Sequence, residues 1–142
     1  MKNAKKTTAL LSLLILASLM LSLVGCGINT AKLWENATYQ TDTTVGEGDT
    51  TFGITVRAGD KSILITVNTN ESILGTALMN EGIISGEMGD YGIYIKAVNG
   101  ISADYNVDKA YWAFYINGEK ANTGADMTDI EDNATYKLSK EK

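Results

Sequence analysis

The chain has 142 residues, of which 17 are acidic, 12 are basic and none is histidine, so its formal net charge is −5. The lack of imidazole excludes Ser-His-Asp hydrolysis and most zinc sites, and the acidic balance disfavours nucleic acid as a partner. Fourteen glycines, no proline and many Thr and Asn residues indicate a sheet-rich, turn-rich fold. A chain of this length supports one compact domain.

The first 25 residues have the layout of an export signal. Three lysines precede an uncharged apolar run over residues 9–24, which is the order of charge and apolar residues in a secretory leader. The run ends in Leu-Val-Gly-Cys, which resembles the lipobox of bacterial lipoproteins, where the cysteine receives palmitate-type acyl chains and the leader is cut just before it. We predict a lipoprotein signal peptide over residues 1–25. An uncleaved anchor is the alternative, although the run is short for a spanning helix.

The membrane anchor is predicted at Cys26, the only cysteine of the chain. Its acylation leaves no disulfide and no thiol for catalysis. Loss of residues 1–25 removes three lysines and no acid, so the formal charge changes from −5 to −8. We therefore expect an acidic domain tethered to the extracytoplasmic face of the cell membrane.

Residues 26–50 are predicted to be the lipidated cysteine and a tether. They show no sustained apolar period and are dominated by Thr, Asn, Asp and Gly, a composition typical of a spacer that holds a domain off the lipid surface. Leu33, Trp34 and Tyr39 favour another interpretation, because a spacer rarely needs a tryptophan. Part of the segment then packs against the domain or forms a first strand.

A β-hairpin and a helix follow. Residues 51–58 and 63–67 alternate between apolar and polar side chains around a Gly59-Asp60 turn, which predicts two antiparallel strands. Asn70 is a suitable N-cap for a short helix with one apolar stripe, and Gly82 is well placed to end it. We expect this helix to cover one face of the sheet.

The rest of the chain predicts more strands. Asn117-Gly118 lies between two strand-like segments and is the strongest short-range signal for a hairpin. Three alternating segments predict strands at residues 91–98, 111–116 and 134–138. The order of elements predicts an α+β fold over residues 51–142, with a β-grasp-like mixed sheet covered by one short helix.

Three segments, SILGTALMNEG, YIKAVNG and YWAFYINGEKANTGADMTDIEDNATYKL, resemble the transcobalamin-like C-terminal domain. The resemblance runs from Phe52 to Leu138. That family occurs as a stand-alone module in exported bacterial lipoproteins, and it closes the vitamin B12 site of transcobalamin and intrinsic factor against a large helical barrel. The resemblance implies that cobalamin or another corrinoid is the bound ligand, and that a helical-barrel protein or a membrane transporter is the partner.

The candidate ligand-binding residues are four aromatic side chains, Tyr105, Tyr111, Trp112 and Tyr115. Flat rings with a polar tip suit a planar or sugar-like ligand in a shallow groove. Alternation places Trp112 and Phe114 on one face of the strand and Tyr111 and Tyr115 on the other. In the alternative interpretation, Trp112 packs in the core, and the tyrosines lie on an open face of the sheet without binding a ligand.

No catalytic residue, metal site or cofactor is predicted. The acidic loop over residues 126–132 has carboxylates that calcium prefers, but its spacing matches no EF-hand, which favours a solvated loop. With no histidine and its cysteine acylated, the chain is expected not to be an enzyme. We predict a lipid-anchored extracytoplasmic ligand-binding domain. The alternative is a cell-surface protein-interaction or adhesion module without a small-molecule ligand.

Overall fold

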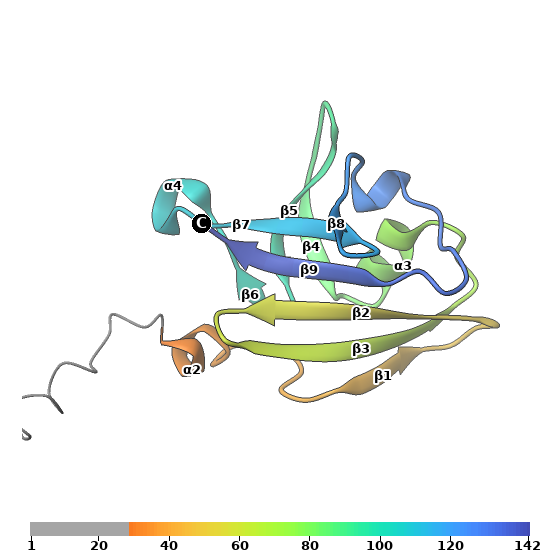
Figure 1. The fold of residues 1–142 in the computed structure, drawn as a ribbon, viewed down its shortest axis with the longest axis horizontal. Coiled ribbons are helices and arrows are strands. Elements are labelled where there is room, and N and C mark those ends of the chain that lie inside the picture. Colours follow the sequence, from red (N-terminus) through yellow and green to blue (C-terminus); the bar gives the residue numbers. More distant parts are fainter. Residues whose placement is uncertain (1–28) are drawn as a thin grey trace, which may run out of the picture.

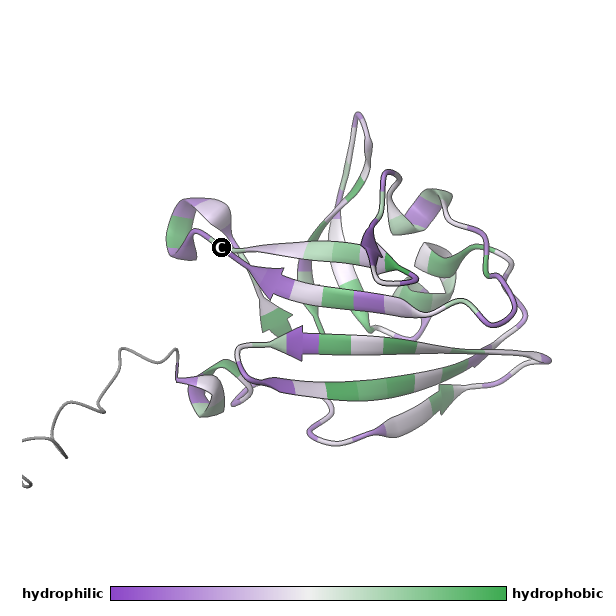
Figure 2. Cartoon of the chain, in the orientation of Figure 1, coloured by the Kyte–Doolittle hydropathy of each residue, from purple (hydrophilic) through white to green (hydrophobic). Residues whose placement is uncertain are grey.

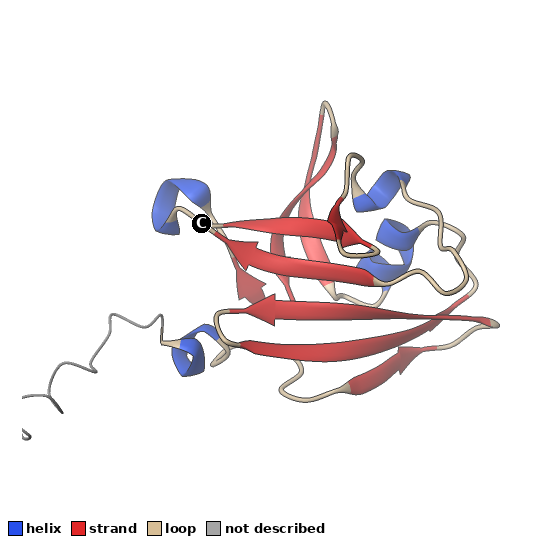
Figure 3. Cartoon of the chain, viewed as in Figure 1, coloured by secondary structure: helices blue, strands red, loops and turns tan. Residues whose placement is uncertain are grey.

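The computed structural model describes residues 29–142, in which two sheets pack around one core. Cys26 and the predicted signal peptide lie outside these residues. The larger sheet has six strands in the order β1-β3-β2-β9-β7-β8, and the smaller has three in the order β4-β5-β6. In Figure 1 the smaller sheet and α3 lie behind the larger sheet. Strands dominate this part of the chain (Figure 3).

The strand bounds are β1 (Thr43–Gly46), β2 (Thr50–Ala58), β3 (Lys61–Thr69), β4 (Ile84–Gly89), β5 (Gly92–Val98), β6 (Ile101–Ser102), β7 (Tyr111–Ile116), β8 (Glu119–Lys120) and β9 (Tyr136–Glu141). The helices are α2 (Thr30–Leu33), α3 (Leu74–Asn80), α4 (Tyr105–Asp108) and the 3-10 turn η2 (Ala125–Met127). None of the helices in the described residues has the length and apolar content needed to cross a bilayer.

The larger sheet is mixed, because β1 with β3 and β2 with β9 are parallel and its other pairs are antiparallel. This confirms the α+β fold class. The predicted strand at 91–98 belongs to the smaller sheet, where it pairs with β4. Sequence patterning missed β4, since five of its six residues are exposed and no buried face alternates along it.

Alternation along β2 and β3 builds the centre of the core. Apolar and polar positions alternate along β2 (Figure 2), and Ile54, Val56 and Ile65 are fully buried. The predicted helix is present as α3, which buries Leu74 and Leu78. Its predicted N-cap is wrong: α3 begins at Leu74 after Ile73, and the Asn70 side chain instead accepts a hydrogen bond from the Asp49 backbone.

The described part of the predicted tether is packed against the domain. Trp34 follows α2 and is 2 % exposed, and its indole Nε1 donates a 2.9 Å hydrogen bond to the Ala58 carbonyl. Further along, β1 adds a parallel strand to β3 and sets Val45 opposite Val67. The tether expectation is therefore corrected for residues 30–46. The sequence of this segment has no regular apolar pattern. Burial of the Trp34 indole and the β1–β3 hydrogen bonds stabilise it instead.

Asn117 and Gly118 form the predicted hairpin turn between β7 and β8, with φ angles of 51° and 83°. Asn tolerates the left-handed conformation because its short side chain finds a local partner. Here the Asn117 carbonyl Oδ1 accepts a 2.9 Å hydrogen bond from the Thr135 backbone. The turn thus also fixes the entry to β9, which begins at Tyr136.

Candidate functional site

The outer face of the larger sheet carries two of the three predicted tyrosines. Tyr111 lies opposite Glu141 and Tyr115 opposite Lys137 in the β7–β9 register, while Lys120 on β8 pairs with Tyr115. Side chains opposite each other in a ladder share a face of the sheet. The core, α3 and the smaller sheet pack on the other face. We call these five residues the tyrosine cluster, and this side of the sheet the open face.

Hydrogen bonds join the tyrosine cluster. The Glu141 carboxylate accepts from the Tyr115 hydroxyl at 2.6 Å and from the Tyr111 hydroxyl at 3.3 Å. The Lys120 ammonium donates to the Tyr111 oxygen at 3.0 Å and lies 4.0 Å from Glu141. The Lys137 ammonium lies 4.1 Å from the centre of the Tyr115 ring, within cation–π range. The cluster therefore presents oriented phenols and two ammonium groups on the open face.

Two side chains of the cluster, Tyr115 and Lys120, have raised pKa values. The hydrogen bond to Glu141 raises the pKa of Tyr115 above its ordinary value, and desolvation adds to this shift. The hydrogen bond to Tyr111 raises the pKa of Lys120, and the Glu141 charge adds to it. Both groups thus keep their protons more firmly than free side chains do. Tyr115 and Lys120 therefore keep their role as hydrogen-bond donors at neutral pH.

The other two predicted residues are separate from the cluster. Trp112 is 7 % exposed, and its Nε1 donates a 3.2 Å hydrogen bond to the Ile101 carbonyl. Its predicted role in ligand binding is corrected: it is a core residue that ties β7 to the smaller sheet. Tyr105 is 55 % exposed on α4, with the Lys109 ammonium 5.4 Å from its ring centre. Of the four candidates, the structure brings only Tyr111 and Tyr115 together.

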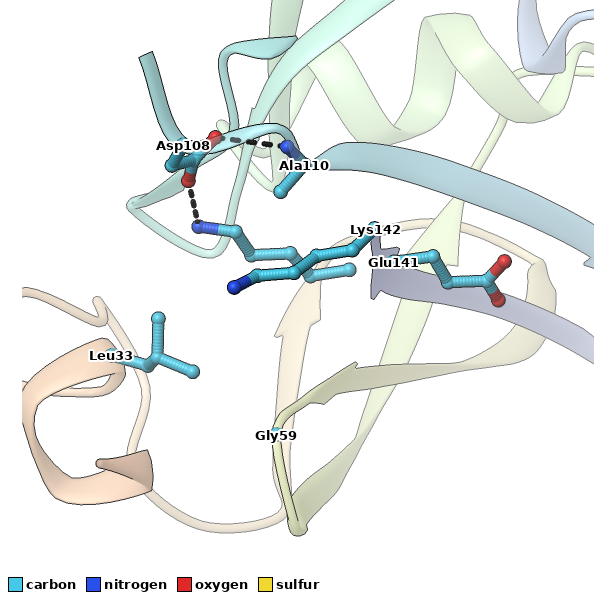
Figure 4. Close-up of a pocket in the computed structure, with 7 residues that line it drawn as sticks. Leu33, Gly59, Asp108, Ala110, Glu141 and Lys142 are labelled. Atoms are coloured by element: carbon cyan, nitrogen blue, oxygen red, sulfur yellow. Dashed lines mark hydrogen bonds and ion pairs between the residues drawn. The ribbon is translucent and has the colours of Figure 1, made fainter. Parts of the chain in front are cut away.

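A groove lies at the end of the domain where α2, the β2–β3 turn and the end of β9 meet (Figure 4). It encloses about 160 Å³, and its lining includes Leu33, Gly59 and Glu141. Asp108 accepts a 3.1 Å hydrogen bond from the Ala110 backbone and forms a 2.7 Å ion pair with Lys140. Glu141 lines this groove and also accepts from the tyrosines, so it connects the groove to the open face.

Asp108 is held in its charged form. Burial alone would raise its pKa, but hydrogen bonds from the Lys140 ammonium and from the Asp104 and Ala110 backbone lower it below the ordinary value. Lys140 also donates a 2.6 Å hydrogen bond to the Ser102 carbonyl. The pair therefore links α4, β6 and β9 at this end of the domain.

The β4–β5 hairpin is an exposed feature that sequence analysis did not single out. It projects from the body of the domain (Figure 1), and Met88 and Tyr91 near its tip are 71 % and 92 % exposed. The Asp126 carboxylate on η2 accepts a 2.9 Å hydrogen bond from the Ile93 backbone, which lies beside the turn opposite Met88, so it ties the hairpin to η2. The available signal was Gly-Asp-Tyr-Gly at 89–92, a turn sequence that contains an aromatic residue.

The acidic loop shows no calcium site. Asp126 in that loop already accepts the hydrogen bond that fixes the hairpin. Among residues 29–142, no three acidic or cysteine side chains gather closely enough to hold a metal ion.

A comparison with known protein families matches residues 70–136 to DUF4430, a domain of unknown function. The matched region contains α3, the β4–β5 hairpin, β7 and β8. It also contains the segments that resemble the transcobalamin-like domain, except for the last two residues of the third segment. No curated protein matches the chain.

Two solved structures share this fold. One is described as a "putative metal binding protein" from Ruminococcus gnavus: it has 29 % sequence identity and a TM-score of 0.61, over 66 % of this chain and 98 % of that one. The other is haptocorrin in complex with Cbi, at 22 % identity and a TM-score of 0.52, over 65 % of this chain. The match spans 25 % of haptocorrin. These similarities confirm the transcobalamin-like resemblance at the level of the fold.

Proposed function

We propose that the chain is a non-enzymatic ligand-binding module, held at the extracytoplasmic face of the cell membrane by acylation of Cys26, and that its ligand is cobalamin or another corrinoid. The observation that carries this proposal is the shared fold with haptocorrin, whose solved structure contains Cbi. Because the match spans 25 % of haptocorrin, we propose that a second protein supplies the other wall of the site. A helical-barrel protein or a membrane transporter would fill that role.

The open face is the surface on which we place the ligand. A corrinoid is a flat macrocycle with amide side chains at its rim, so it offers a broad face and many hydrogen-bond acceptors. The tyrosine cluster supplies two phenols and two ammonium groups, and the raised pKa values of Tyr115 and Lys120 keep these two side chains protonated. Glu141 accepts hydrogen bonds from both phenols and fixes their positions, which reduces the entropy lost when a ligand binds.

The test is a titration of the detergent-solubilised full chain with cyanocobalamin and cobinamide, followed by equilibrium dialysis. We expect saturable binding that weakens about tenfold when Tyr111 and Tyr115 are both changed to Phe, because each lost hydrogen bond costs about 0.5–1.5 kcal/mol. Tyr94→Phe is the matched control, since Tyr94 is exposed on the hairpin and outside the cluster. Lack of binding, both alone and with a barrel-type partner, rejects the corrinoid.

A second candidate function is a cell-surface protein-interaction or adhesion module. The exposed Met88 and Tyr91 and the free edge of β4 favour it, because sheet edges and exposed aromatic residues are common contact sites for partner strands. A photo-crosslinker at position 91 on intact cells distinguishes the two. Stoichiometric capture of one protein or polysaccharide in corrinoid-free medium favours adhesion, whereas capture that requires corrinoid favours the first function.

A further inference from the structure

We propose that one end of the domain rests on the bilayer that holds its own lipid anchor. This end surface consists of α2 with its flanks (29–36), the β2–β3 turn (59–61), α4 with its caps (104–110) and the last residues of β9 with Lys142 (140–142). These segments lie side by side: α2, the turn, α4 and β9 all line the groove of Figure 4. A hydrogen bond joins Asp60 to Thr30, and an ion pair joins Lys140 to Asp108. The inference rests on the lipid anchor proposed above, and the occupant of the surface is a lipid bilayer.

Only a short length of chain separates the anchor from the domain. Cys26 precedes Asn29 by three residues, which span at most about 11 Å when fully extended. A tether over residues 26–50 would have allowed about 80 Å. The packed Trp34 removes that freedom, and the Thr30 hydroxyl also accepts a hydrogen bond from the Asp60 backbone. An acyl chain on Cys26 therefore brings α2 and the neighbouring end surface next to the headgroups.

Charge is distributed unevenly between the end surface and the rest of the domain. The end surface contains five lysines and five acidic residues, namely Lys32, Lys61, Lys109, Lys140 and Lys142, with Glu35, Asp60, Asp104, Asp108 and Glu141. The remaining described residues contain four basic and twelve acidic side chains. The end surface is thus formally neutral, and the net charge of −8 lies elsewhere. An anionic lipid surface repels the rest of the domain within about a Debye length, which favours this orientation.

The composition of α4 also suits a membrane interface. Val107 is 81 % exposed and Tyr105 is 55 % exposed on this single turn of helix, and neither side chain belongs to the core. Lys109 follows with its ammonium near the Tyr105 ring. An aromatic ring, an aliphatic side chain and a lysine that reaches toward water form the combination found at membrane interfaces. In Figure 1, α4 and α2 lie at the same end, and the β4–β5 hairpin projects from another side.

The experiment uses the acylated full chain in vesicles that contain anionic lipid and nitroxide-labelled headgroups. Because Cys26 is the only cysteine and is acylated, Asn106→Cys and Met88→Cys each provide one thiol for a fluorescent label. Both native side chains are exposed, and the substitution at 106 keeps Tyr105 and Val107. We expect at least threefold stronger quenching at 106 than at 88. Equal quenching, or stronger quenching at 88, overturns the proposal.

A longer linker after the anchor tests whether the end surface itself prefers the bilayer or is only held there by the short linker. Insertion of about 20 Gly and Ser residues after Gly27 keeps the anchor but gives the domain roughly 25 Å of r.m.s. reach. We expect quenching at 106 to remain stronger than at 88, since the end surface itself prefers the bilayer; loss of the difference overturns this. Co-sedimentation with the vesicles reports the anchor separately. A chain that stays in the supernatant refutes the lipid anchor, and with it this inference.

Discussion

Replacement of Trp34 by Ala tests whether the N-terminal segment is part of the folded domain. Trp34 is 2 % exposed, donates to the Ala58 carbonyl and has the Lys61 ammonium 4.5 Å from its ring centre. A buried tryptophan removes about 150–250 Å² from water, which at about 25 cal/mol per Å² corresponds to about 4–6 kcal/mol. A compact denatured state reduces this value. We expect Trp34→Ala to lower the free energy of unfolding by about 3–5 kcal/mol.

The assay is urea denaturation of the full chain in detergent micelles, in which the midpoint falls while the slope with denaturant stays unchanged. Trp34→Phe is the matched control: it keeps most of the apolar area but leaves the Ala58 carbonyl without its donor, at a cost of about 1–3 kcal/mol. If Trp34→Ala changes the unfolding free energy by less than about 0.5 kcal/mol, the tryptophan behaves as a surface residue. That result would show that the N-terminal segment is not packed against the domain. It would also remove the limit on the distance between Cys26 and the domain.

Three further predictions concern other polar contacts. Asn99→Ala should lower the unfolding free energy by about 2–4 kcal/mol in urea denaturation. The buried Asn99 side chain accepts a hydrogen bond from the Tyr39 backbone N–H and donates one to the Tyr39 carbonyl, both at 2.8 Å. A loss below about 0.5 kcal/mol contradicts this prediction. Glu141→Gln should return the raised pKa of Tyr115 toward 10.0 in an ultraviolet titration, whereas an unchanged titration shows that Glu141 is not the cause. The lowered pKa of Asp108 stabilises the fold above its unfolded value of about 3.8, and this contribution is lost as pH falls through the folded pKa. Asp108→Asn should therefore destabilise the protein at pH 7, by a difference that narrows below about pH 4; a constant difference argues against charge as the cause.

Local patterns predicted the elements whose signals lie within a few residues. Alternation along residues 51–58 and 63–67 produced β2 and β3 because one face of each strand is buried. The Asn117-Gly118 turn was predictable because positive φ restricts the choice of residue. The α+β class followed from the order of these elements.

Non-local contacts explain what the sequence analysis missed. Trp34 donates its hydrogen bond to Ala58, 24 residues away, and β1 pairs in parallel with β3. Neither contact produces a periodic pattern of apolar residues in the nearby sequence. In the same way, alternation placed Tyr111 and Tyr115 on one face but could not identify Glu141 as their shared acceptor, since that depends on the β7–β9 register. Trp112 had two interpretations because alternation separates two faces without saying which one the core covers.

Amide chemical-shift mapping can show whether a corrinoid binds on the open face. The ¹⁵N-labelled full chain is titrated with cobinamide while the backbone resonances of residues 29–142 are followed. We predict shifts concentrated at the tyrosine cluster on β7, β8 and β9, and little change in the β4–β5 hairpin. Shifts confined to the hairpin, or no shifts at saturating ligand, would show that cobinamide does not bind on the open face.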